Sequence, residues 1–263
     1  MFKRLLLGSA GIIVASGMVA TSASAMMIDD FIDAPQRITI DGASAPASEA
    51  LFDNDSGLAP GEELGSQATI IGGYRDLRTN LLTDGGDGGS TDARVTGTGS
   101  GRFVHEQGSG VGSNSLITWG GEGEELGGAG LGGFDLTDGG ASNNIHLNII
   151  RADAAVVWSL ALWDTDGESA YYTFGNPGTI NTTLFPAGAH FYLPFSIWTG
   201  INAALDMTMI DFIQFGANIE SAEDFDTTVD LVETVGIPEP ASMTLLGAGL
   251  MGLAGMSRRR KLA

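Results

Sequence analysis

The feature that most constrains this chain is the alternation of large apolar residues with other residues over short segments. Between Ile145 and Ile149 every second residue is large and apolar, and residues 156–163 follow the same pattern. A period of two places successive side chains on opposite faces of a β-strand, so both segments are predicted to be half-buried strands. Clusters of Gly and Asp, as at 84–89 and 138–140, separate such segments and supply tight turns.

Three further segments, 37–40, 93–96 and 225–234, also favour strands, and only residues 198–209 could hold a short helix. No internal repeat or Pro/Ser-rich linker divides the region between the two ends of the chain. Ten to twelve short strands with turn signals at short intervals predict an all-β fold. We expect a single jelly-roll-like β-sandwich over residues 26–235.

Charge is distributed unevenly along the 263 residues. The chain has 12 Lys and Arg against 32 Asp and Glu, a net charge of −20, but six of the basic residues lie near the termini. Residues 26–237 therefore hold 31 acids against six arginines. This acid excess argues against nucleic-acid binding, which needs a basic face. The absence of cysteine excludes disulfides, thiolate metal sites and cysteine nucleophiles.

The N-terminus has the organisation of a secretory signal peptide. Lys3 and Arg4 precede an apolar run at 5–20, and Ala23-Ser24-Ala25 is a small-x-small cleavage site. The alternative is a permanent membrane anchor, but the run is shorter than the ~20 residues that span a bilayer. We expect the general secretion machinery to export the protein and residues 1–25 to be removed.

The C-terminus carries three features in a fixed order. Pro238-Glu239-Pro240 precedes a charge-free stretch at 241–257, and a basic cluster at 258–261 follows. As a helix, the stretch spans about 25 Å, enough for a thin bilayer, and the basic cluster would stay on the cytoplasmic side. The two prolines keep the preceding strip extended and open to a processing enzyme. An ordinary tail anchor is the alternative.

This order of features closely resembles the PEP-CTERM sorting signal, over residues 236–263. The resemblance implies that an exosortase, a membrane protease-transpeptidase, reads Pro238, Glu239 and Pro240 and then releases or transfers the protein. It also implies a Gram-negative bacterium that makes exopolysaccharide. We expect transient anchoring in the inner membrane, followed by a place at the cell surface or in the extracellular matrix. The one departure is Ile237, where Val is commoner.

Several short segments of the central region also resemble segments of known proteins. Residues 71–77, 131–137 and 224–226 look like a body type that recurs in PEP-CTERM proteins. That body is similar to galactose-binding-like and carbohydrate-binding jelly rolls. The resemblance implies the fold, but a fold alone does not establish an activity.

No catalytic residues are predicted. No serine lies in a G-x-S-x-G motif, and the three histidines, His105, His146 and His190, are about forty residues apart. Carboxylates are too numerous to single out a glycosidase pair. We therefore expect a non-enzymatic protein, with a secreted polysaccharide hydrolase sorted by the same route as the alternative.

Two acidic segments are candidate calcium sites. Asp53 with Asp55, and Asp164 with Asp166, have the spacing of the first ligands in an EF-hand loop. Neither segment has the glutamate that completes such a loop. Ordinary Asx turns between strands explain the same pattern, so both interpretations stay open.

Sugar binding is the other candidate activity, because flat aromatic rings with a polar edge can stack on sugars. Trp163 and Tyr172 lie near a strand end and a loop, where we expect exposed rings. Trp158 is predicted to be buried by its alternation. The sequence thus predicts an exported acidic protein that associates with exopolysaccharide.

Overall fold

The computed structural model describes residues 25–33, 35–41, 50–53, 69–84, 88–97, 101–120, 130–175, 180, 188–220 and 222–236, with only the backbone at 50–53. Most of the predicted signal peptide with Ala23, the candidate ligand Asp55, and the Pro238–Pro240 strip with its apolar stretch lie outside these residues. Among the residues described, no helix is long and apolar enough to cross a membrane.

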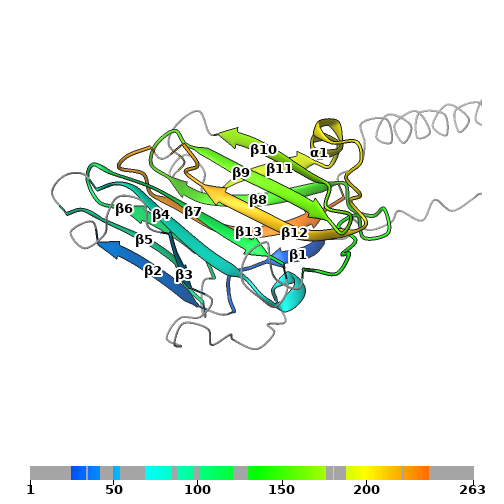
Figure 1. The fold of residues 1–263 in the computed structure, drawn as a ribbon, viewed down its shortest axis with the longest axis horizontal. Coiled ribbons are helices and arrows are strands. Elements are labelled where there is room, and N and C mark those ends of the chain that lie inside the picture. Colours follow the sequence, from blue (N-terminus) through cyan, green and yellow to red (C-terminus); the bar gives the residue numbers. More distant parts are fainter. Residues whose placement is uncertain are drawn as a thin grey trace, which may run out of the picture.

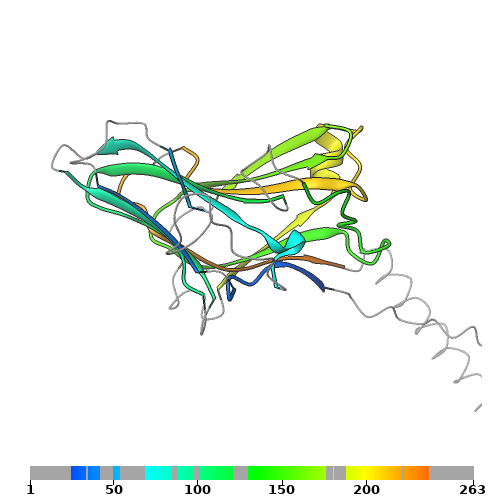
Figure 2. The ribbon, with the colours of Figure 1, turned by 60° about the horizontal axis from the view of Figure 1, so that its bottom comes forward.

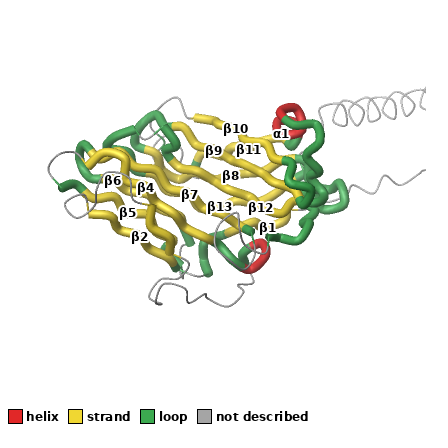
Figure 3. Tube along the Cα trace, viewed as in Figure 1, coloured by secondary structure: helices red, strands yellow, loops and turns green. Residues whose placement is uncertain are grey.

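Strands dominate the described part of the chain (Figures 1 and 3). They are β1 (Ala25–Asp29), β2 (Gln36–Asp41), β3 (Ala50–Asp53), β4 (Asp76–Asp84), β5 (Ser90–Val95), β6 (Phe103–Gln107), β7 (Val111–Trp119), β8 (Asn144–Ala152), β9 (Val157–Asp164), β10 (Ser169–Gly175), β11 (Ala189–Pro194), β12 (Ile210–Ala217) and β13 (Thr227–Val235). The helices are the 3-10 helix η1 (Ile71–Gly73) and the α-helix α1 (Ser196–Ile201).

The strands form two antiparallel sheets that lie as two layers (Figure 2). The seven-stranded sheet has the order β11-β8-β13-β6-β5-β2, and β1 also pairs with β13. The six-stranded sheet has the order β10-β9-β12-β7-β4-β3. Strands at matching places in the two orders are consecutive in sequence, such as β8 with β9, so the chain passes back and forth between the layers. The predicted all-β, jelly-roll-like sandwich is confirmed.

The core lies between the sheets and follows the predicted alternation. Ile145, Leu147 and Ile149 of β8 are fully buried. Trp158 of β9 is also fully buried, as predicted, and its ring lies 5.7 Å from that of Phe191. The inward faces of β8 and β9 are therefore the ones that their own sequences predict.

The predicted helix is shorter and lies earlier than the expected range. Helix α1 ends at Ile201, and residues 202–209 form turns. Asn202 Oδ1 accepts a hydrogen bond from the amide of Ala204, and Asp206 Oδ1 accepts one from that of Thr208. Such local side-chain bonds compete with helical backbone bonds and stop the helix.

A buried polar layer also joins the two sheets. His105 Nδ1 of β6 lies 2.7 Å from Ser115 Oγ of β7, and Ser115 also contacts Thr79 of β4. Burial lowers the pKa of His105 to about 4, although Asp92 and Glu106 act in the opposite direction. His105 and Ser115 are both fully buried, so their contact holds the layers together and does not face a solvent-borne substrate.

The N-terminal strand is fastened to this core by a buried ion pair. Arg75 Nη1 lies 2.6 Å from Asp29 Oδ2, and Trp119 Nε1 donates to the same oxygen at 2.8 Å. Both charged side chains are fully buried. Removing one partner of such a pair typically costs ~3–5 kcal/mol, because the other charge stays buried and unpaired. Strand β1 is thus an integral part of the fold.

Candidate functional site

The outer face of the six-stranded sheet carries two aromatic rings. Leu160 and Leu162 of β9 are fully buried, so Trp163 points the other way, and it is partly exposed. On β10, Tyr171 is 51% exposed. The register pairs Tyr171 with Ala161 and Ser169 with Trp163. The two rings are therefore diagonal neighbours, whose backbones lie ~7–8 Å apart.

Tyr172 does not share this face. Its ring stacks on Phe174 at 6.3 Å and meets Trp198 edge-on at 6.2 Å, so it is partly buried against the core. The sequence-based expectation that Tyr172 is exposed is wrong, because adjacent residues of a strand point to opposite faces and Ala170 and Tyr172 take the inner one. Tyr171 occupies the outer position instead.

Small residues lie between the rings and the polar part of this face. Ser159 and Ala161 of β9 are almost fully covered by their neighbours. At Gly216 of β12, a Cβ would lie 2.4 Å from Ser159 Oγ, so close packing requires glycine there.

Amide and hydroxyl groups lie on the strands beyond the small residues. Gln214 Nε2 of β12 donates to Thr118 Oγ1 at 3.0 Å, and Asn80 Nδ2 of β4 donates to Asn114 Oδ1 at 2.8 Å. We call this outer surface the ring face; its residues are Tyr171, Trp163, Ser159, Ala161, Gly216, Gln214, Thr118, Asn80 and Asn114. Rings that stack and amides that exchange hydrogen bonds are the groups that recognise sugar rings and hydroxyls.

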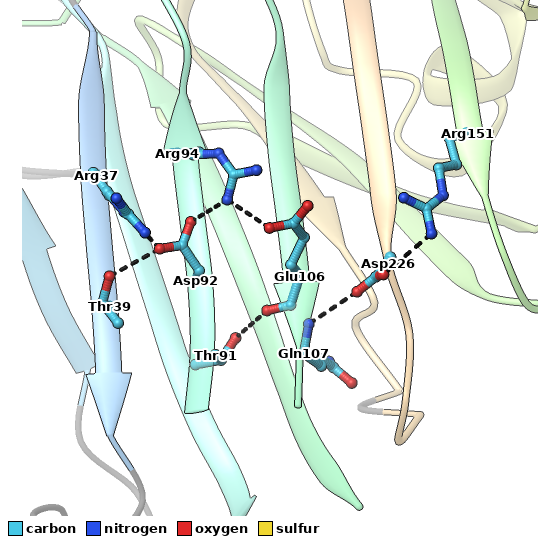
Figure 4. Close-up of polar contacts among 9 residues, drawn as sticks. All are labelled: Arg37, Thr39, Thr91, Asp92, Arg94, Glu106, Gln107, Arg151 and Asp226. Carbon is cyan, nitrogen blue, oxygen red and sulfur yellow. Dashed lines mark hydrogen bonds and ion pairs between the residues drawn. The ribbon is translucent and has the colours of Figure 1, made fainter. Parts of the chain in front are cut away.

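The outer face of the seven-stranded sheet has a different chemistry (Figure 4). Asp92 of β5 binds Arg37 Nε of β2 at 2.6 Å, and Arg94 Nη1 lies within 2.6 Å of both Asp92 and Glu106. Burial acts to raise the pKa of Asp92, but hydrogen bonds from Arg94, Arg37 and Thr39 outweigh it and leave that pKa lowered. The charges on this face satisfy one another.

This pattern continues toward β13 and β8. Asp226 Oδ1 accepts the amide of Gln107 at 3.0 Å, and Asp226 Oδ2 lies 3.3 Å from Arg151 Nη2. Burial raises the pKa of Asp226, and the negative charge of Asp153 acts in the same direction. We call this surface the ion-pair face; its charged residues are Arg37, Asp92, Arg94, Glu106, Arg151 and Asp226.

Two histidines that are far apart in sequence meet on the same sheet. His146 Nε2 of β8 lies 2.9 Å from His190 Nδ1 of β11, and His146 Nδ1 lies 2.8 Å from Glu233 Oε1 of β13. Tyr192 stacks on His146 at 4.5 Å. Nothing in the sequence signalled this cluster, because three separate strands supply it. Within the described ranges, no group of three or more His, Asp or Glu is arranged to hold a metal ion.

The candidate calcium ligands are placed as follows. Asp164 is buried, and its carboxylate accepts three backbone amides, those of Asp166, Glu168 and Asp206, at 2.9–3.0 Å. These are the contacts of the Asx-turn interpretation. Asp166 is exposed, and Asp53 is the last residue of β3. Calcium binding at these segments stays a prediction.

The C-terminal region has a match among known protein families. Residues 236–261 match the PEP-CTERM protein-sorting motif. This confirms the sorting signal that the Pro-Glu-Pro strip, the apolar stretch and the basic cluster predicted. The motif marks proteins that are exported, anchored in the membrane and processed by an exosortase. The sequence matches no curated protein.

Several solved structures resemble the chain. The family 11 carbohydrate-binding module of the cellulase Lic26A-Cel5E of Clostridium thermocellum is 13% identical with a TM-score of 0.37, over 83% of this chain and 98% of the module. The family 30 module of Cel9D-Cel44B from the same organism is 15% identical with a TM-score of 0.37, over 82% and 99%. An exo-β-agarase is 12% identical with a TM-score of 0.39, over 82% of this chain and 26% of the agarase. No functional conclusion follows at these scores, and the fold assignment rests on the strand pairing above.

Proposed function

We propose that this is a non-enzymatic protein of the cell surface or extracellular matrix whose ring face binds exopolysaccharide. The observation that carries the proposal is the outward position of Trp163 and Tyr171 on one face, beside paired amide and hydroxyl groups. Within the described part of the chain, neither ring stacks on another aromatic side chain. A sugar can therefore stack on the exposed part of either ring without displacing an aromatic contact.

The charge of the body narrows the class of polysaccharide. Residues 26–237 carry 31 acids against six arginines, so a strongly anionic polymer would be repelled over most of the surface. The sugar-binding groups named on the ring face are uncharged. The proposed ligand is accordingly a neutral or weakly charged polysaccharide.

The sorting motif supports the route to this ligand. In the proposed sequence of events, secretion removes residues 1–25, the apolar stretch at 241–257 anchors the chain in the inner membrane, and an exosortase acts near Pro238–Pro240. The sandwich at 26–235 then remains at the surface or in the matrix. Intact mass of the extracellular protein tests both ends, and a mass that retains residues 258–261 would contradict the processing step.

The binding proposal is tested with exopolysaccharide from producing cells. Immobilised protein should retain this polysaccharide, and Tyr171→Ala should weaken retention. Tyr192→Ala is the matched control, because Tyr192 is 48% exposed on the opposite sheet. Equal retention by the two variants would contradict the assignment to the ring face. Release of new reducing ends during incubation would favour the polysaccharide hydrolase instead.

A further inference from the structure

The two ends of the sandwich domain leave the fold at one place. Strand β1 begins at Ala25 and β13 ends at Val235, and the antiparallel register pairs these two residues directly. The sorting motif begins at the next residue, 236. The predicted signal peptide and the sorting tail are therefore both attached to the same end of the sandwich, which lies on the right in Figure 1.

The segment that links the sandwich to the apolar stretch is short. Residues 236–240 separate β13 from the apolar stretch that begins at 241, and five extended residues span at most ~18 Å. Strand β13 has nine residues, about 30 Å, and runs from the opposite end of the sandwich to this one. A tether this short keeps the end that carries Val235 near the bilayer.

The loops at this end are acidic. Asn143 donates its amide to Val235 O, Phe134 pairs with Ile210, and the Asp164–Glu168 turn joins the adjacent ends of β9 and β10. Residues 130–143, 164–168 and 202–211 hold seven carboxylates and no Lys or Arg. Anionic headgroups would repel these loops, which disfavours pressing them against the lipid.

We infer that the end of the sandwich formed by the start of β1, Val235 and these acidic loops is the membrane-facing surface of the anchored protein, held just off the lipid. The strands then stand along the membrane normal. Both outer faces stay open at the sides, and the β8–β9 turn lies at the other end of these strands, away from the bilayer. This inference rests on the anchoring described under the proposed function, not on polysaccharide binding.

Energy transfer in proteoliposomes tests the orientation. The chain has no cysteine, so a single introduced cysteine is a unique labelling site. Ala141→Cys lies in an exposed loop at the membrane-facing end, and Ala155→Cys lies in the exposed β8–β9 turn at the other end. With the full chain reconstituted beside acceptor-labelled lipid, transfer from position 141 should be at least about twofold more efficient, because ~30 Å of strand separates the two sites.

Equal transfer from the two positions would overturn the inference, since the sandwich would then lie flat, and stronger transfer from 155 would reverse it. A chain that does not float with the vesicles would also overturn it, because the anchor would be absent.

In vesicles with anionic lipid, transfer from 141 should rise as salt increases from about 0.01 to about 1 M, which shortens the screening length from ~30 to ~3 Å. No rise would contradict the electrostatic stand-off. Retention of polysaccharide is measured without membranes, so the two proposals fail independently.

Discussion

The two outer faces of the sandwich use their side chains in opposite ways. On the ion-pair face, the Asp92 carboxylate accepts hydrogen bonds from Arg37, Arg94 and Thr39, so these charged groups have their partners inside the protein. On the ring face, Tyr171 is half exposed and its ring has no aromatic partner among the residues described. A face whose groups are already paired must break contacts to bind a ligand. The two rings of the ring face have only to lose water, although the amides beside them are paired, and this face is therefore the better binding surface.

The largest expected effect is the loss of polysaccharide affinity when both rings of the ring face are removed. Covering one aromatic ring with a sugar contributes roughly 1.5 kcal/mol, so losing two costs about 3 kcal/mol. We expect Trp163→Ala combined with Tyr171→Ala to weaken polysaccharide affinity about a hundredfold. Affinity electrophoresis measures this change. The matched control is Arg37→Ala combined with Arg94→Ala on the ion-pair face, and a similar loss in that control would break the comparison.

The next largest effect is the pH dependence of stability that arises from His105, in the buried polar layer between the two sheets. The pKa of His105 is about 4 in the folded protein and 6.5 at its ordinary value, so between these values the unfolded state binds more protons. Stability should therefore fall as the pH is lowered, by about 2 kcal/mol from pH 7 to pH 5. Urea unfolding at the two pH values measures this loss, which His105→Gln should reduce.

Measuring polysaccharide retention at low pH also distinguishes the ring face from the ion-pair face. If the ring face binds through uncharged groups, retention at pH 5 should fall only as far as the protein unfolds. Loss of retention from fully folded protein would instead implicate a titrating group, such as those on the ion-pair face.

A smaller effect is expected at Asp92. Asp92→Asn keeps the shape of the side chain but removes the charge that faces Arg37 and Arg94. Because Arg37 is 64% exposed, solvent weakens these pairs, and we expect a loss of only about 1 kcal/mol at pH 7. The lowered pKa of Asp92 means that its contribution is present above the ordinary value of 3.8 and disappears as the pH falls below it. Chemical denaturation checks both points, and polysaccharide affinity should not change.

The smallest effect is the response to salt. Added NaCl screens exposed charges, so the penalty of Asp92→Asn should shrink by a few tenths of a kcal/mol. Affinity of the ring face for a neutral polysaccharide should stay within about twofold over the same range, because its binding groups are uncharged. A steep salt dependence of affinity would show that charged groups take part in binding.

The sequence by itself determined the features that depend on local chemistry. Alternation along β8 and β9 marked the residues that face the core, because a strand always presents successive side chains to opposite sides. The Pro-Glu-Pro strip, the apolar stretch and the basic cluster are contiguous, so they could be identified as a sorting signal without a fold.

Only the tertiary structure decided which distant residues share a face. Of two adjacent tyrosines, Tyr171 points outward and Tyr172 inward, because the pairing of β10 with β9 places Tyr172 over the core. The contact between His146 and His190, and the pairing of Ala25 with Val235, join strands whose sequences carry no sign of one another. The alternation along one strand limits which face it buries, but which distant strands become its neighbours is decided only when the whole sandwich packs.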